Sequence, residues 1–315
     1  MAHKPRLSGA TLRWGFFASR VLVLALICMV AAWTHYLNLK AGYNNARLVE
    51  LAHGPWMRRF YEASEAFFGL LGDPLEVAQQ SGGMVWSSSI LGLPLTDPVA
   101  ALSVASRGSM PGTQFLLGLL IPLGVALTFG RVFCAAICPA SLVFYVTSRL
   151  RRLLKRWFLL PNLNPGRGLA WGVLVGGLVL ANMYGHGVWT LVLPYLAMGQ
   201  ALFHTIVYES SVAGGVAAAA LGALVFFALA DLLLGDHFVC RHLCPTGRLL
   251  GSLGRRAPLG VVRDAPNCKT SCNACTEICP LAADPKQDDL LDCSSCGECL
   301  SVCPTSCLSM GRKTA

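Results

Sequence analysis

Two short motifs in the sequence each hold two cysteines, separated by three residues, and end in Cys-Pro. They read FCAAICPA at residues 133–140 and FVCRHLCPTG at residues 238–247, and each follows a long apolar segment. On a helix, side chains four residues apart face the same side, so both sulfurs of a pair are expected to point one way. The motifs therefore predict a redox or metal site, with packing thiols at helix ends as the alternative. This four-thiol group is Cys134, Cys138, Cys240 and Cys244.

A denser group of cysteines lies near the C-terminus, where nine of the fourteen fall between Cys268 and Cys307. They form two arrays, Cys268-x3-Cys272-x2-Cys275-x3-Cys279-Pro280 and Cys293-x2-Cys296-x2-Cys299-x3-Cys303-Pro304. The second array has the spacing of bacterial two-cluster ferredoxins, in which the last cysteine of a run binds the other cluster. This spacing predicts two [4Fe–4S] clusters. We call their ligands the first cysteine set (Cys268, Cys272, Cys275 and Cys303) and the second cysteine set (Cys279, Cys293, Cys296 and Cys299).

The first array departs from the usual spacing, because three residues rather than two separate Cys268 from Cys272. This leaves open which thiols bind there, and Cys307 receives no role. Structural zinc is the alternative, but zinc sites usually separate two close pairs by roughly a dozen residues or more. Disulfides are not expected, because the topology argued below places this region in the reducing cytosol.

The composition indicates a membrane protein. The 315 residues are 54% hydrophobic and 13% charged, whereas soluble domains carry about 25% charged residues. A helix needs about 20 apolar residues to cross a bilayer. Four segments meet this requirement, at about residues 14–36, 113–133, 168–190 and 212–234.

Basic residues predict how these segments are oriented, because they accumulate in cytoplasmic loops. They are frequent at the N-terminus, between the second and third segments and after Arg241, whereas acids balance them in residues 37–112 and residues 191–211 have none. The pattern predicts a multi-pass protein of the inner membrane with both termini in the cytoplasm and a periplasmic loop at residues 37–112. It also explains the net charge of +9 without nucleic-acid binding.

Two loop segments carry further patterns. After Pro55, apolar residues recur at helical spacing with charges between them, which predicts an amphipathic helix. It would lie on the membrane surface or cap the bundle, or else cover a lipid-soluble substrate. The acidic stretch DPKQDDLLD at residues 284–292 is interpreted as a solvated linker, with a docking patch for a basic partner as the alternative.

The expected fold is an all-α polytopic membrane protein. Residues 1–254 would form four transmembrane helices arranged as a two-helix duplication, and residues 255–315 a small cytoplasmic ferredoxin-like domain with two [4Fe–4S] clusters. Ionisable groups at membrane depth are often functional. Asp231 is such a group, while His35 and His186 lie near the outer ends of the first and third segments, where they could accept a proton from a quinol. All three are candidates for a quinol site, with packing as the alternative.

These features resemble the NapH/MauN family of ferredoxin-type membrane proteins, the membrane component of a quinol dehydrogenase. The resemblance rests on GLPLTDPVAALSVASRG at residues 92–108, the two CxxxCP motifs and the two arrays. It implies an electron-transfer subunit with no catalytic residue of its own, which takes electrons from the quinone pool. It also implies a periplasmic ferredoxin-type partner like NapG or MauM and a periplasmic oxidoreductase that serves nitrate, nitrous oxide or methylamine metabolism.

The core also resembles the larger NosR and CcoG proteins. The likeness to CcoG implies an alternative function, the handling of thiols or copper during maturation of a respiratory metalloenzyme. Cu(I) favours soft thiolate ligands, so the four-thiol group would then be the copper site.

Overall fold

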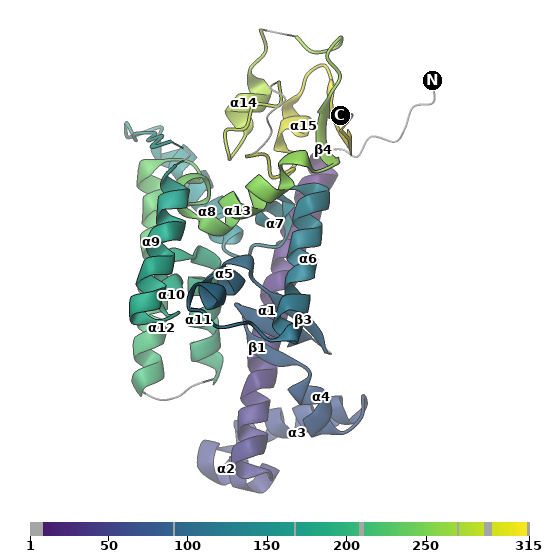
Figure 1. Ribbon diagram of the computed structural model, residues 1–315, viewed down its shortest axis with the longest axis vertical. Coiled ribbons are helices and arrows are strands. Elements are labelled where there is room, and N and C mark those ends of the chain that lie inside the picture. Colours follow the sequence, from purple (N-terminus) through teal and green to yellow (C-terminus); the bar gives the residue numbers. More distant parts are fainter. Residues whose placement is uncertain are drawn as a thin grey trace.

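The computed structural model describes residues 9–90, 92–166, 168–207, 211–269, 271–286 and 292–313. Lys4 and Arg6 of the basic N-terminus and residues 287–291 of the acidic stretch lie outside these ranges. The described chain is mainly helical, as expected, but it also contains five short strands in two sheets (Figure 1). The strands are three to five residues long, too short for their sequence pattern to predict them.

Two helices are long and apolar enough to cross a membrane, α1 (Gly9–Tyr43) and α12 (Ser211–Leu234). The helices α6 (Thr113–Phe129) and α9 (Leu169–Tyr184) are apolar but shorter. All four expose large apolar side chains, which in a soluble protein would be turned inward. This exposure supports association with a membrane. Examples from the four helices are Leu22, Leu120, Val175 and Phe226.

The amphipathic helix predicted after Pro55 is confirmed as α3 (Pro55–Gly69). It lies with α2 (Ala46–His53) and α4 (Pro74–Gln79) around the C-terminal end of α1, at the bottom of Figure 1. Its buried face packs against this end of α1. The aromatic contact there joins Tyr36 to Tyr61 and Phe68, with ring centroids 5.4 and 5.3 Å apart.

A three-stranded antiparallel sheet follows, with strands β1 (Gly82–Met84), β2 (Ser87–Ile90) and β3 (Leu93–Thr96). It leads into α5 (Pro98–Ser106), which begins where Asp97 accepts hydrogen bonds from the first backbone amides. An N-cap carboxylate of this kind stabilises a helix start. The sheet packs closely on α6, because a Cβ at Gly118 would lie 2.6 Å from Oγ1 of Thr96.

The second half of the bundle is built around a fully buried tryptophan. After α9 the chain forms α10 (Val188–Val192) and α11 (Pro194–Val207), and α11 packs along α12 and α1. Trp189 of α10 lies so close to Gly177 of α9 that a Cβ there would approach its ring to 2.7 Å. The same tryptophan donates a hydrogen bond to Ser103 of α5 at 3.0 Å.

The remaining elements gather at the other end of the molecule, at the top of Figure 1. After α6 come α7 (Val132–Ala136) and α8 (Ser141–Leu154). After α12 come the π-helix η1 (Val239–Leu243), α13 (Pro245–Leu253) and the 3₁₀ turn η2 (Gly254–Arg256). The C-terminal region contains α14 (Ala274–Ile278) and α15 (Glu298–Val302), flanked by the antiparallel pair β4 (Leu259–Arg263) and β5 (Leu308–Arg312).

Candidate redox and metal centre

The cysteine arrays are positioned by two very short helices that end at Cys-Pro. α14 contains Cys275 and ends at Cys279, and α15 contains Cys299 and ends at Cys303. A residue before proline is driven out of helical conformation, and both terminal cysteines are extended, with ψ of 117° and 109°. Each Cys-Pro step therefore turns the chain away from its own array, toward the other one.

The structure brings together the second cysteine set, because three of its thiols interact electrostatically with Cys299. Burial, together with the neighbouring thiols of Cys279 and Cys293, raises the pKa of the Cys296 thiol to about 11, although a backbone hydrogen bond at Glu298 acts in the opposite direction. Such thiols keep their protons at neutral pH when no metal is bound. Metal binding at this set would therefore release protons.

The first cysteine set lines a small cavity of about 20 Å³. Cys303 reaches this cavity from the second array, as the cross-ligation pattern predicts. Cys307 also lines it, and its sulfur lies 3.5 Å from that of Cys303. Sequence reasoning gave Cys307 no role, because no ferredoxin spacing includes it, but the turn into β5 places its thiol among the others.

The two CxxxCP motifs meet at the same end of the molecule. Cys134 lies in α7 and Cys138 just after it, while Cys240 lies in η1 and Cys244 caps α13. Burial raises the pKa of the Cys240 thiol, and Cys138, Cys244 and Cys134 raise it further by their proximity. The four thiols therefore lie within electrostatic range of one another, although each motif follows a different long helix.

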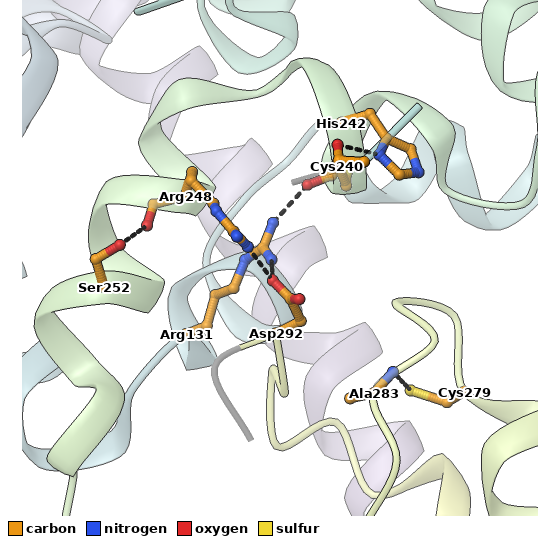
Figure 2. Close-up of polar contacts among 9 residues, drawn as sticks. Arg131, Cys240, His242, Arg248, Ser252, Cys279, Ala283 and Asp292 are labelled. Atoms are coloured by element: carbon orange, nitrogen blue, oxygen red, sulfur yellow. Dashed lines mark hydrogen bonds and ion pairs between the residues drawn. The ribbon is translucent and has the colours of Figure 1, made fainter. Parts of the chain in front are cut away.

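A buried arginine ties this group to the C-terminal region, as Figure 2 shows. Arg131 donates a hydrogen bond to the backbone oxygen of Cys240, and its Nη1 lies 3.3 Å from Oδ1 of Asp292. Arg248 reaches the same carboxylate oxygen at 2.5 Å. Gly247 leaves room for this arrangement, because a Cβ there would lie 2.7 Å from Arg131. Asp292 immediately precedes Cys293, so the arginines hold the start of the second array.

Two further arginines lie between the four-thiol group and the second cysteine set. Arg20 of α1 donates a hydrogen bond to the Ala135 oxygen at 2.5 Å and interacts electrostatically with Cys138 and Cys296. Arg241 interacts with Asp292 and Cys279. From the sequence alone, these arginines contributed only to the charge pattern that predicts the orientation of the membrane segments. Their position shows that the second cysteine set is the one that faces the four-thiol group.

The three candidate quinol residues lie apart from one another. His35 is buried, with Nδ1 3.1 Å from the Val207 oxygen. His186 lies 2.9 Å from the Ser103 hydroxyl. Asp231 is buried and accepts a hydrogen bond from Thr147 at 2.7 Å. Each makes the contacts of a packed polar side chain, and their role in a quinol site stays a prediction.

Comparison with protein families places the CxxxCP motifs in a recognised domain. A model described as a 4Fe-4S binding domain matches twice, at residues 112–157 and 216–261. Each match contains one CxxxCP motif, and both end before Cys268. The repeated match agrees with the duplication predicted from the sequence.

The curated relatives of this chain include ferredoxin-type proteins and an electron transport protein. The ferredoxin-type protein NapH of Escherichia coli K12 is 33% identical over 234 residues, 69% of this chain and 76% of that protein. The methylamine utilization ferredoxin-type protein MauN of Methylobacillus flagellatus is 33% identical over 207 residues, 65% and 68% of the two chains. The putative electron transport protein YccM of Escherichia coli K12 is 24% identical over 267 residues, 80% and 67% of the two chains.

No solved structure matches the chain. The identity and coverage of the NapH and MauN relatives, the repeated 4Fe-4S domain and the cysteine arrangement described above agree with one another. They indicate an iron–sulfur electron-transfer protein that associates with a membrane. This chain belongs to the NapH/MauN family of ferredoxin-type proteins.

Proposed function

We propose that the protein is a membrane subunit that takes electrons from the quinol pool and passes them through two [4Fe–4S] clusters to a periplasmic redox system. The observation that carries this proposal is the continuous arrangement of thiols at one end of the molecule. The four-thiol group adjoins the second cysteine set through Arg20, and the first cysteine set follows within the same small domain.

The donor sets have the thiolate chemistry by which proteins hold [4Fe–4S] clusters. Each set consists of four thiols from two short loops, and one set lines a cavity of its own. Among the described residues, no three His, Cys, Asp or Glu side chains come close enough to hold a single metal ion. When bound, two clusters would supply two one-electron acceptors, which match the two electrons that a quinol releases with two protons.

The protein's own residues would position these groups. Arg131 and Arg248 hold Asp292 and thereby the backbone that leads into Cys293. Arg131 is almost fully buried, with 1% of its side chain exposed. A buried charge pair of this kind constrains geometry, because removal of one partner leaves the other uncompensated. We assign to the arginines the task of keeping the second cysteine set against the four-thiol group.

The four-thiol group is the proposed redox or metal centre nearest the bundle. Its four soft donors also favour a second candidate function, the handling of Cu(I) in maturation of a metalloenzyme. The two functions predict different metal contents. Copper that binds to these thiols and remains after removal of the iron–sulfur clusters would support maturation, whereas its absence would support electron transfer.

The proposed setting is the inner membrane, with both termini in the cytoplasm. The cysteine arrays and the CxxxCP motifs lie at one end of the molecule (Figure 1), while the proposed acceptor lies across about 30 Å of bilayer. A ferredoxin-type partner like NapG or MauM would complete the path to a periplasmic oxidoreductase of the nitrate, nitrous oxide or methylamine type.

Anaerobic electron paramagnetic resonance of the purified full chain tests the proposal. We expect signals of reduced [4Fe–4S] clusters after addition of decylubiquinol or of a short-chain menaquinol analogue. Clusters that respond only to dithionite would show that quinol is not the direct donor, and would contradict the proposal.

A further inference from the structure

A cavity of about 330 Å³ lies inside the membrane-associated bundle. Its walls come from α1, the sheet β1–β3, α6 and α11, which pack against one another around it. The lining is overwhelmingly apolar, and typical residues are Leu26, Val30, Val125 and Phe203. Ligand pockets in proteins usually measure roughly 300–1,000 Å³ and combine apolar walls with a few polar groups. The cavity therefore has the size and character of a site for an apolar ligand.

Three polar side chains meet at one part of this lining, Thr96, Asp97 and Tyr195. Thr96 is buried, and within the described ranges its Oγ1 has no hydrogen-bond partner. This hydroxyl lies against Gly118 of α6, where an added Cβ would be 2.6 Å from it, so it does not open into the cavity. Tyr195 donates its proton to Oδ2 of Asp97 at 2.7 Å.

The carboxylate of Asp97 retains capacity for one more donor. Its Oδ1 accepts from the amides of Val99 and Ala100 at 2.7 and 3.3 Å, while Oδ2 accepts only from Tyr195. A carboxylate has about four acceptor positions, and three are used. The remaining position on Oδ2 could accept a hydrogen bond from a hydroxyl group of a ligand in the cavity.

The same polar groups connect the cavity to the four-thiol group. Phe133, Ile137 and Pro139, which flank Cys134 and Cys138 in the chain, form part of the cavity wall. On the other side, the Tyr195 hydroxyl lies 2.9 Å from that of Thr246. Because the Tyr195 hydroxyl donates its one hydrogen bond to Asp97, the Thr246 hydroxyl is the donor in this contact. Thr246 follows Cys244-Pro245, so both CxxxCP motifs border the cavity or its polar end.

We propose that this cavity binds the head group of a lipid-soluble quinol, with Asp97 accepting a hydrogen bond from a quinol hydroxyl and Tyr195 holding the Asp97 carboxylate in place. The inference rests on the proposed function, and it places the quinol, which is the electron donor in that function, beside the four-thiol group. A lipid acyl chain would fill the apolar part equally well, but it would leave the open position on Asp97 unused. None of the earlier candidates His35, His186 and Asp231 lines the cavity.

Equilibrium binding of decylubiquinol and of decylubiquinone to the detergent-purified full chain tests the assignment, together with quinol-dependent reduction of the clusters. Asp97→Asn keeps the helix cap, because asparagine caps as well as aspartate, but it removes the charged acceptor. We expect decylubiquinol to bind about tenfold more weakly, which corresponds to about 1.4 kcal/mol. Decylubiquinone should be affected less, because it has no hydroxyl to donate.

Val125→Phe adds bulk to the cavity wall and should abolish binding of both forms. Val225→Phe is the matched control, since Val225 lies on α12 with 57% of its surface exposed. Cluster content after dithionite reduction reports whether each variant has folded. It should be the same in all of them.

The outcomes separate the two proposals. Unchanged binding in Asp97→Asn and Val125→Phe, with clusters that quinol still reduces, would overturn the cavity assignment and leave the proposed function standing. Binding that depends on the cavity, with clusters that quinol does not reduce, would confirm the site and contradict quinol as electron donor. A phospholipid that copurifies with the wild type, is lost in Val125→Phe and is not displaced by decylubiquinone would also overturn the assignment.

Discussion

The two cysteine-rich regions of this protein are assembled in different ways. In the C-terminal arrays, all eight assigned cysteines lie between Cys268 and Cys303, and short loops bring them together. The four-thiol group takes one pair from residues 134–138 and the other from residues 240–244, and the helix bundle must fold before they meet. Local spacing therefore specifies the first kind of site, whereas tertiary packing specifies the second.

The groups around the sulfurs differ in the same way. In the arrays, backbone amides approach the thiols, as Ala283 N approaches Cys279 Sγ at 3.3 Å and Ser295 N approaches Cys293 Sγ at 3.4 Å. Backbone amides also approach Cys138 and Cys244 in the four-thiol group, but this group has in addition the side chains of Arg20 from α1 and of Arg131 beside it. The backbone amides come with the loop, but the arginines depend on helix packing. Substitutions should therefore affect the two regions differently.

The largest effect is expected from loss of a ligand in the second cysteine set. Cys299→Ser should remove one of the two clusters and so about half of the iron assigned to the arrays. Iron analysis and dithionite-reduced spectra measure the loss. Cys28→Ser, in α1 and away from both regions, is the matched control. Full iron content in Cys299→Ser would contradict the assigned set.

A second, smaller effect should come from the buried arginine. Arg131→Leu leaves Asp292 with Arg248 alone and removes the donor to the Cys240 oxygen. Breaking a buried charge pair costs about 3–5 kcal/mol, so we expect a lower thermal midpoint with both arrays still able to bind iron. Arg156→Leu, at an exposed position on the same side of the molecule, should change the midpoint little. Equal midpoints for the two variants would show that Arg131 does not join the regions.

The sequence predicted the parts that depend on local pattern. Ferredoxin spacing predicts the two cysteine sets, apolar periodicity predicted α3, and the length of the apolar segments predicted the main apolar helices. It did not identify Arg131, Arg248 or Tyr195, because their partners lie 44 to 161 residues away in the chain. A lone arginine at the end of an apolar segment has the same local signal whether it faces lipid head groups or a buried carboxylate. Only the packed bundle distinguishes the two.

The packing around Arg131 gives a third prediction. Gly247→Ala would place a Cβ 2.7 Å from the guanidinium and force it away from Asp292. Such overpacking typically costs about 1–3 kcal/mol. Gly222→Ala in α12 meets nothing within 4 Å and should be neutral or slightly stabilising, because alanine favours helices. Thermal midpoints that fall equally in both variants would indicate a backbone effect rather than a steric one.

The smallest effect is expected at Cys307, which tests how strictly sequence spacing selects ligands in the C-terminal arrays. Cys303 and Cys307 both line the first cavity, with their sulfurs 3.5 Å apart. Cys303 is held in an extended conformation before Pro304, which directs it toward the other array. Cys307 instead lies in the turn just before β5. We therefore expect Cys307→Ser to keep both clusters and Cys303→Ser to lose one. The opposite result would mean that tertiary packing, rather than spacing, selects the fourth ligand, and the arrays would then resemble the four-thiol group.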